Sequence, residues 1–432
     1  MKKVVALTSW LFLFPFSFSV VKADTQVDLQ KLIDDAPARS EIHLERGLYE
    51  GPVVIDKPLT ITGEKGAVID GGKSDNVVTV QADDVTIHGV TIQHSGKGAQ
   101  QAGILLDKVN TATISKNTFN NVHNGVFIRG GGSHTIANNH FSSYPGHFST
   151  RGNGIHLLAT KDNQMVENEM TNVQDGIYLD ESSNNQIVNN TISESRYATH
   201  FMFSSNNFVD NNHFFNNING IMAMNSKGID IQENLFEKQL NYRGFGVLIY
   251  ETEDVQLHNN KLLYNHNGLS LQSSSRVSVK NNLIAGNYIG LITEGKNSDI
   301  KLSENHFEGN IIQTKLTGEP FPLDDGKMGN YWDDYHSYDL NGDGIGEVAY
   351  NGSSGYSELL HQYPHLQFYF ESPAMTVWQS VEKMFSLQSD SGNVDRFPVV
   401  KRAKEFEIPY LLLLMIPVGM TMYIWRKKRR ES

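Results

Sequence analysis

The chain contains no cysteine in 432 residues. This absence excludes disulfide bonds, so an exported protein of this sequence must owe its stability to a continuous core. It also excludes thiolate ligands and leaves no thiol to be oxidised beside a redox metal. Any soft metal ligand in this chain has to be the thioether of methionine.

Basic residues are scarce as well. Lys and Arg total 36 against 48 Asp and Glu, which gives a formal net charge of −12. The acidic excess is larger within residues 24–407, because many basic residues lie near the two ends of the chain. Such a surface argues against nucleic acid or an acidic polymer as ligand and favours cations or basic protein surfaces.

Long apolar runs occur at only two places. Residues 1–23 combine a basic head, an apolar run and the small residue Ala23, which is typical of a secretory signal peptide; an uncleaved anchor is the alternative. Residues 408–425 are nearly all apolar and precede the basic tail 426–432, which predicts a single transmembrane helix with a cytoplasmic tail. A helix that docks on a membrane partner without crossing is the alternative there.

Between these runs the sequence repeats with a period of about 22 residues. A strand phrase, Gly-Ile-x-Leu, alternates with the phrase Asn-x-apolar, and both lengthen at the same two places. The strand phrase starts at Gly103, Gly125, Gly154, Gly176, Ala198, Gly220, Gly246, Gly268 and Gly290. The leucine-rich pattern is missing and a propeller blade is about twice as long. The sequence therefore predicts an all-β, right-handed parallel β-helix with asparagine ladders at its corners.

The same patterns divide the chain into regions. Residues 24–84 are expected to hold a capping helix within 26–36 and the first coils, followed by the repeats of 85–315. Residues 316–388 are expected to form a C-terminal cap with an acidic loop and a helix. Residues 389–407 are polar and charged, which predicts a linker to the membrane helix.

Alternate residues of each strand phrase are predicted to point outward, and one group of them is unusual. His200, Met202, Met222 and Met224 come from adjacent coils and are expected at the corners of one small rectangle. Imidazole and thioether donors favour Cu(I) over harder ions, so these four residues are a candidate copper site. His156, two coils away, is a weaker candidate. A methionine-rich docking patch is the alternative, whereas Met165 and Met170 are expected in the core or at its edge.

The two lengthened repeats both interrupt the same corner. Seven extra residues fall within Ser142–Arg151 and four within Lys238–Arg243. Insertions on one edge of a solenoid usually mark its binding side. Tyr144, His147, Tyr242 and Arg243 are therefore candidate partner contacts.

Past the repeats, Asp339, Asn341, Asp343 and Glu347 follow the spacing of the first half of an EF-hand calcium loop. The bidentate glutamate of that motif is missing, because position 350 is Tyr. Calcium binding and a metal-free Asp/Asn/Gly turn both remain open.

The segment from Gly329 to Tyr350, GNYWDDYHSYDLNGDGIGEVAY, resembles the C-terminal signature of the NosD family. Tyr363-Pro364 and Ser372-Pro373-Ala374 extend the resemblance, and Glu347-Val348-Ala349-Tyr350 departs from the family's usual Asp-x-Pro-Tyr. The resemblance implies an exported, periplasmic accessory protein that acts with an ABC transporter, an ATPase plus a membrane subunit. It further implies delivery of copper for nitrous oxide reductase, with a copper donor protein as a further partner.

Three functions follow from these observations. The first is a non-enzymatic copper-binding assembly factor, anchored in the inner membrane by residues 408–425. The second is a β-helix enzyme that acts on uronates. Its candidate groups would be Asp107 beside Arg129, and Asp180 near the histidines. The negative net charge of the chain argues against such acidic substrates. The third is a docking platform without metal.

Overall fold

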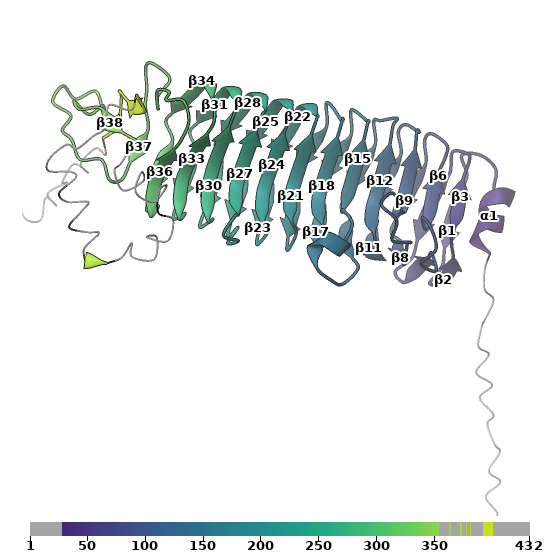
Figure 1. Cartoon of the computed structure of the whole chain (residues 1–432). Coiled ribbons are helices and arrows are strands. Elements are labelled where there is room, and N and C mark those ends of the chain that lie inside the picture. Colours follow the sequence, from purple (N-terminus) through teal and green to yellow (C-terminus); the bar gives the residue numbers. More distant parts are fainter. Residues whose placement is uncertain are drawn as a thin grey trace, which may run out of the picture.

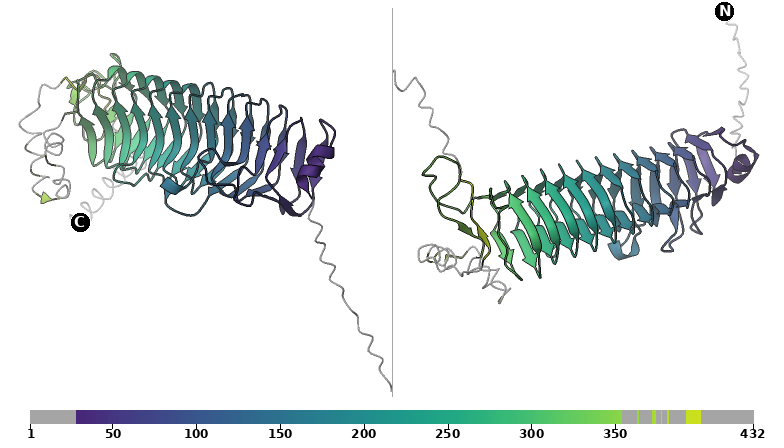
Figure 2. Two further views of the ribbon diagram at one scale, coloured as in Figure 1. Left: turned by 45° about the vertical axis from the view of Figure 1, so that its right-hand side comes forward. Right: turned by 90° about the horizontal axis from the view of Figure 1, so that it is seen from above.

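The computed structural model describes residues 28–353, 363, 372–373, 377, 381 and 392–400. They form a right-handed parallel β-solenoid in which each coil contributes three short strands. The coils stack in one row, with the helix α1 (Leu29–Asp35) at one end (Figures 1 and 2). The predicted all-β parallel β-helix is therefore confirmed.

Within the described residues, sheet A contains twelve parallel strands. They are β1 (Glu41–Leu44), β4 (Thr60–Gly63), β7 (Thr86–His88), β10 (Thr113–Ser115), β13 (Thr135–Ala137), β16 (Gln164–Val166), β19 (Gln186–Val188), β22 (Ser205–Asp210), β25 (Lys227–Gln232), β28 (Glu253–His258), β31 (Ser275–Lys280) and β34 (Ser298–Ser303).

Sheet B contains thirteen strands in the same part of the chain. They are β2 (Gly47–Glu50), β5 (Ala67–Asp70), β8 (Thr91–Gln93), β11 (Thr118–Val122), β14 (His140–Ser143), β17 (Glu169–Thr171), β20 (Thr191–Ser193), β23 (His213–Phe215), β26 (Leu235–Glu237), β29 (Lys261–Leu263), β32 (Leu283–Ala285), β35 (His306–Glu308) and β37 (Tyr331–Trp332).

Sheet C, which carries the candidate site, contains twelve described strands. They are β3 (Val53–Ile55), β6 (Val78–Val80), β9 (Ala102–Asp107), β12 (Asn124–Arg129), β15 (Ile155–Leu158), β18 (Asp175–Asp180), β21 (Tyr197–Met202), β24 (Asn219–Met224), β27 (Phe245–Tyr250), β30 (Asn267–Gln272), β33 (Ile289–Glu294) and β36 (Ile312–Leu316).

The strands of sheet C follow the predicted alternation. Ile177 pairs with Thr199 and Leu179 with Phe201 across the β18–β21 ladder, and all four side chains are buried. Tyr178 and Asp180, which alternate with Ile177 and Leu179 along β18, lie on the other face and are partly exposed. A regular period of two with one apolar face is what holds each coil in register with the next.

A ladder of buried asparagines closes the corner between sheets A and B. The side-chain amide of Asn190 donates to Oδ1 of Asn212 at 3.0 Å, and Asn212 donates in turn to Asn234 at 2.9 Å. The same contact recurs from Asn117 to Asn330. These bonds satisfy corner groups that would otherwise be buried without partners, and they confirm the predicted ladder.

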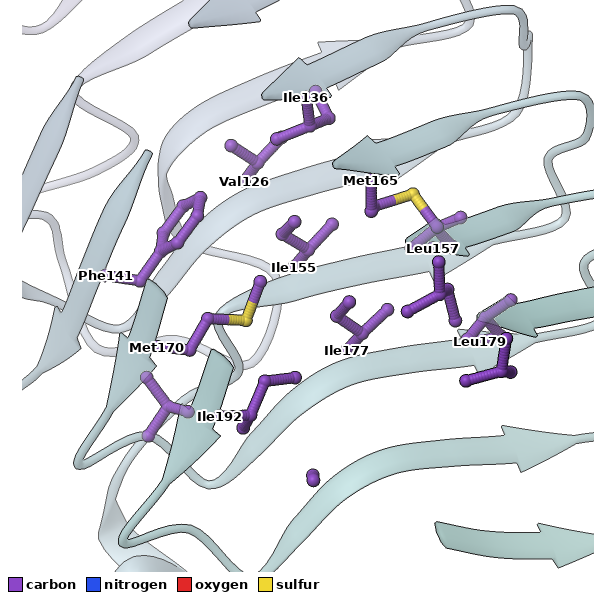
Figure 3. Close-up of a cluster of buried hydrophobic side chains, with 14 of the residues drawn as sticks. Val126, Ile136, Phe141, Ile155, Leu157, Met165, Met170, Ile177, Leu179 and Ile192 are labelled. Carbon is purple, nitrogen blue, oxygen red and sulfur yellow. The ribbon is translucent and has the colours of Figure 1, made fainter. Parts of the chain in front are cut away.

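The core methionines are placed as the sequence predicts. Met165 and Met170 are fully buried and point into the interior among isoleucine and leucine side chains (Figure 3). Their thioethers fill space between Ile155, Leu157 and Ile177, as expected of flexible apolar side chains. They are therefore separate from the methionines on the outer face of sheet C.

The N-terminal end is closed by α1, as predicted. Asp28 caps this helix by accepting a hydrogen bond from the backbone N–H of Lys31 at 3.1 Å. Leu29 and Ile33 are fully buried against the first coil, whereas Leu32 remains 39% exposed. The helix thus covers the open end of the apolar core.

The C-terminal end uses residues beyond the repeat. Trp332 stacks on Phe307 at 4.2 Å between ring centroids, and Asn330 continues the asparagine ladder. The short strands β38 (Tyr350–Asn351) and β39 (Val394–Asp395) pair antiparallel. Asp395 is buried and accepts a hydrogen bond from the backbone N–H of Asn330. Residues 392–400 therefore belong to the cap, although their composition predicted part of a linker.

Several sequence predictions lie outside the described residues. These are the signal peptide of residues 1–23, most of the helix expected after Pro373, the membrane helix 408–425 and the tail 426–432. In the part of the chain that the structure describes, no helix is long and apolar enough to span a bilayer.

Candidate metal centre

The four candidate copper ligands lie together on the outer face of sheet C. His200 of β21 is in register with Met222 of β24, and Met202 is in register with Met224. Neighbouring strands are about 4.8 Å apart and alternate residues of one strand about 7 Å apart. The structure thus brings the four residues to the corners of one rectangle, as the repeat predicts.

His200 belongs to a ladder of rings that crosses several coils. Ring centroids of Phe127 and His156 are 4.4 Å apart, those of His156 and Tyr178 4.7 Å, and those of Tyr178 and His200 4.6 Å. The Tyr178 ring therefore stands between the two histidines. His156 does not join the His/Met rectangle directly, because a complete coil separates them.

The surroundings of His200 differ from the prediction. Its position on the strand faces outward, yet only 7% of the residue is exposed. Tyr178 stacks on one side of the imidazole, and Tyr197 meets it edge-on at 5.0 Å. Among the described residues, Nε2 of His200 is buried and has no hydrogen-bond partner. An orphaned imidazole nitrogen of this kind costs free energy unless something binds it.

The other ring nitrogen of His200 is firmly held. Nδ1 lies 3.1 Å from Oδ2 of Asp175, a residue with no exposed surface. Nε of Arg196 donates to Oδ1 of Asp175 at 2.8 Å, and its Nη2 donates to Oδ2 at 2.7 Å. Burial would raise the pKa of Asp175, but the bonds from Arg196 and His200 outweigh it and lower that pKa. The carboxylate is thus ionised and orients the ring.

His156 is enclosed in a similar way. Its Nε2 is buried and, within the described residues, unpartnered, and its Nδ1 lies 3.3 Å from Nδ2 of Asn153. Burial is the main reason that the pKa of His156 falls to about 4; the nearby Asp175 opposes the shift. His156 is therefore neutral at ordinary pH.

The methionines of the rectangle are half-buried rather than enclosed. Tyr178 donates its hydroxyl hydrogen to Sδ of Met202, with 3.4 Å between oxygen and sulfur. Burial, followed by the charge of Asp180, raises the pKa of Tyr178 to about 12. The phenol consequently stays protonated and remains a donor to the sulfur.

These donors fit a soft monovalent ion. In the described part of the chain, no group of three or more His, Asp or Glu side chains is close enough to hold a metal ion. The donors that this face does bring into register are three thioethers and one imidazole, and such donors suit Cu(I) better than Zn²⁺, Ca²⁺ or Mg²⁺. The orphaned Nε2 of His200, beside three methionine positions, supplies such a set.

Sequence reasoning missed Asp175, Arg196 and Tyr197 around His200, and it also missed Asn153 beside His156. A signal for them exists in the residue before the strand glycine, which is Asn153, Asp175 and Asn219 in three of the central coils. Asp175 is the one acidic residue at that position in any coil of the repeat. A single charged residue at a repeat position that is otherwise uncharged indicates that its side chain has a specific partner.

The acidic side chains of the loop in the cap accept hydrogen bonds from the loop's own backbone. Both carboxylate oxygens of Asp339 accept backbone N–H groups, from Gly342 at 2.6 Å and from Gly344 at 2.9 Å. Oδ1 of Asp343 accepts the N–H of Ile345 at 2.8 Å, and Glu347 accepts that of Leu340 at 3.3 Å. These bonds account for the turn without metal, and a calcium role for Asp339, Asn341, Asp343 and Glu347 stays a prediction.

The two corner insertions enclose a shared groove of about 500 Å³. It is lined by His147 and Arg151 from the first insertion, by Lys238 and Leu240 from the second, and by Glu194. The first insertion, which contains the short 3₁₀ helix η1 (Phe148–Thr150), projects from the side of the solenoid (Figures 1 and 2).

The candidate partner contacts do not all share this exposed position. Tyr242 is 70% exposed, and His147 and Arg243 are also exposed. Tyr144 is instead buried, and its hydroxyl donates to the carbonyl of Ser95 at 2.5 Å. Tyr144, predicted as a partner contact, is therefore not on the surface, because its side chain turns inward and bonds to the preceding coils.

Comparison with known proteins places this geometry in context. Two overlapping segments, residues 65–147 and 143–337, match the family model of NosD, described as a periplasmic copper-binding protein. The "Probable ABC transporter binding protein NosD" of Stutzerimonas stutzeri is 30% identical over 131 residues, which cover 30% of each chain. The protein of the same description from Pseudomonas aeruginosa is 29% identical over 125 residues, which cover 28% of this chain and 29% of that one. The chain thus spans about 30% of the length of these curated relatives.

A solved structure with a similar fold is the A-module of the Azotobacter vinelandii mannuronan C-5 epimerase AlgE6. The TM-score is 0.54 with 12% sequence identity, over 67% of this chain and 92% of that module. At this identity the similarity concerns the β-solenoid and not the chemistry of its surface.

Proposed function

Because this chain belongs to the NosD family of periplasmic copper-binding proteins, we propose that it binds Cu(I) on the outer face of sheet C through His200, Met202, Met222 and Met224. The protein acts as an assembly factor, not as an enzyme. It receives the ion from a copper donor protein and passes it on for nitrous oxide reductase maturation.

One observation carries this proposal. Nε2 of His200 is buried without a partner among the described residues, and His200 is in register with Met222 of the adjacent strand. A copper ion at this position would satisfy the nitrogen and be reached by flexible thioethers from both strands. Half-buried methionines also suit transfer, because an incoming protein can approach the sulfur atoms from solvent.

The partners follow from the family. The curated relatives are named as ABC transporter binding proteins, and we propose that this chain likewise works beside such a transporter. A periplasmic solenoid anchored by the apolar run 408–425 would hold the copper site close to the transporter's membrane subunit.

Carbohydrate chemistry has less support in this surface. Asp107, considered for uronate chemistry, accepts two hydrogen bonds from Arg129, at 3.0 and 2.8 Å. The carboxylate that contacts His200 is Asp175, which is buried and held by Arg196. Neither carboxylate has the exposure and freedom that a general acid or base acting on a polymer requires.

The experiment is a measurement of Cu(I) bound per purified full chain, in competition with a chromogenic Cu(I) chelator. The double variant His200→Ala/Met222→Ala should lose most of the copper that the wild type retains. Met165→Leu is the matched control, because it removes a thioether from the core and should leave copper binding unchanged. Equal copper retention by the double variant and the wild type would refute the site.

A further inference from the structure

The two histidines of the ring ladder have different partners at Nδ1. Nδ1 of His200 faces a carboxylate oxygen of Asp175, and Nδ1 of His156 faces the amide nitrogen of Asn153. Asp175 and Asn153 occupy the same place in successive coils, directly before the strand glycine. Since a neutral imidazole carries one proton, the partner at Nδ1 decides which nitrogen offers a lone pair.

The partner of His200 can only accept. Asp175 is ionised and receives two N–H groups of Arg196, so it has no hydrogen to donate. The proton of neutral His200 therefore lies on Nδ1, and Nε2 carries the lone pair. In many metal sites, the ring nitrogen of a histidine that does not bind the metal donates to a carboxylate in this way.

The partner of His156 can only donate. Oδ1 of Asn153 accepts the backbone N–H of Asp175 at 3.2 Å, which fixes the orientation of the amide. Its Nδ2 then faces Nδ1 of His156, so that nitrogen accepts and the proton lies on Nε2. An imidazole held in this tautomer offers an N–H at its buried Nε2 and no lone pair for a metal.

We propose that Asp175 is a positioning residue that makes His200 the copper ligand, and that Asn153 keeps His156 from becoming a second one. This inference rests on the proposed copper function. It removes His156 from the ligand set, although His156 and His200 occupy equivalent places two coils apart. Asn153 lies in the same coil as His156, whereas Asp175 reaches His200 from the preceding coil. The chemical nature of the Nδ1 partner, amide or carboxylate, would then select which histidine binds the ion.

The first test needs no metal. In the metal-free full chain labelled with ¹⁵N-histidine, long-range ¹⁵N–¹H correlation spectra distinguish the two imidazole tautomers. His200 is expected as the Nδ1–H form and His156 as the Nε2–H form. Finding the opposite form at either histidine would overturn the proposal.

The second test exchanges the two partners and measures Cu(I) affinity by chelator competition. Asp175→Asn should weaken Cu(I) binding about 10- to 100-fold, the usual loss when the group behind a ligating histidine is removed. Asn153→Asp should move the proton of His156 to Nδ1 and raise the Cu(I) affinity or the number of ions bound. Circular dichroism and urea unfolding identify variants that keep the fold.

The outcomes separate the two proposals. A folded Asp175→Asn variant with wild-type copper affinity overturns the role of Asp175 but not the copper site. An Asn153→Asp variant that retains the Nε2–H form of His156 overturns the role of Asn153 even where Asp175→Asn fails to fold. If the wild type shows both expected tautomers but binds no Cu(I), the copper function itself is refuted.

Discussion

The indole Nε1–H of Trp332 donates to Oδ2 of Asp395 at 2.9 Å, and this bond ties the last turn of the solenoid to a segment far along the chain. The backbone N–H of Asn330 donates to the same oxygen at 2.8 Å. Asp395 has no exposed surface, so its carboxylate ends the asparagine ladder inside the cap.

We expect Asp395→Ala to destabilise the solenoid by about 3 kcal/mol, because it leaves the buried donors of Trp332 and Asn330 without an acceptor. Urea unfolding followed by circular dichroism measures the free energy of unfolding of the variant and the wild type. Asp56→Ala, an exposed carboxylate near the other end, is the control and should stay within about 0.5 kcal/mol of the wild type. Equal stability of the two variants would show that residues 392–400 do not brace the cap.

His134 should make the stability depend on pH. It is fully buried at a corner position where the following coils have Asn163, Asn185 and Asn207, and its backbone N–H donates to Oδ1 of Asn163. Burial is the main cause that lowers its pKa from 6.5 to about 4. The unfolded chain therefore binds a proton at higher pH than the folded chain, so stability is complete above about pH 6.5 and is lost as the pH falls toward 4.

The variant His134→Asn should remove this part of the pH dependence, worth up to about 3 kcal/mol between pH 7 and pH 4. It also replaces the imidazole by the residue that the next coils use at this corner. The measurement is the free energy of unfolding of both proteins at a series of pH values. If the unfolding free energies of the variant and the wild type change with pH in the same way, His134 is not the source of this pH dependence.

The fold was predictable because every coil repeats the same requirements. A strand glycine such as Gly176 admits the close approach of the next coil, where an added Cβ would lie 2.5 Å from the carbonyl oxygen of Ala198. The side-chain amide of an asparagine such as Asn190 donates to the carbonyl of Val188 within its own corner and to Oδ1 of Asn212 in the next coil. The same pattern also brought His200, Met202, Met222 and Met224 together, because register follows from the period.

The rest depended on side-chain contacts that the period does not express. Asp175 precedes its strand glycine and reaches His200 of the next coil, a contact that only the conformation of both side chains reveals. Burial of His200 also depends on the rings of Tyr178 and Tyr197. Asp395 lies in a polar segment whose composition is that of a linker, and only its donors identify it as part of the cap.

Metal selectivity should depend on the thioethers. The triple variant Met202→Leu/Met222→Leu/Met224→Leu keeps the shape of the rectangle but leaves His200 as its only donor. We expect Cu(I) affinity to fall at least about 100-fold, because soft ligands favour the soft ion, whereas Zn²⁺ binding should change far less. Competition titrations with Cu(I) and with Zn²⁺ measure the two affinities.

The matched variant Met165→Leu/Met170→Leu changes only core thioethers and should bind Cu(I) like the wild type. A parallel loss of both ions in the triple variant would point to a structural effect instead.

Tyr242 should contribute to partner binding without affecting copper. Its ring is 70% exposed beside Arg243 in the second insertion, directly after Asn241, which lines the groove. An aromatic ring this exposed has no role in the core. Truncating an aromatic anchor at an interface typically costs about 2 kcal/mol, so Tyr242→Ala should weaken association with the ABC transporter roughly 30-fold.

Tyr264→Ala is the matched control, because Tyr264 is 59% exposed but belongs to neither insertion. Association is measured with the detergent-purified transporter immobilised and the full chain in solution. Equal weakening by both variants, or by neither, would place the partner on another face of the solenoid.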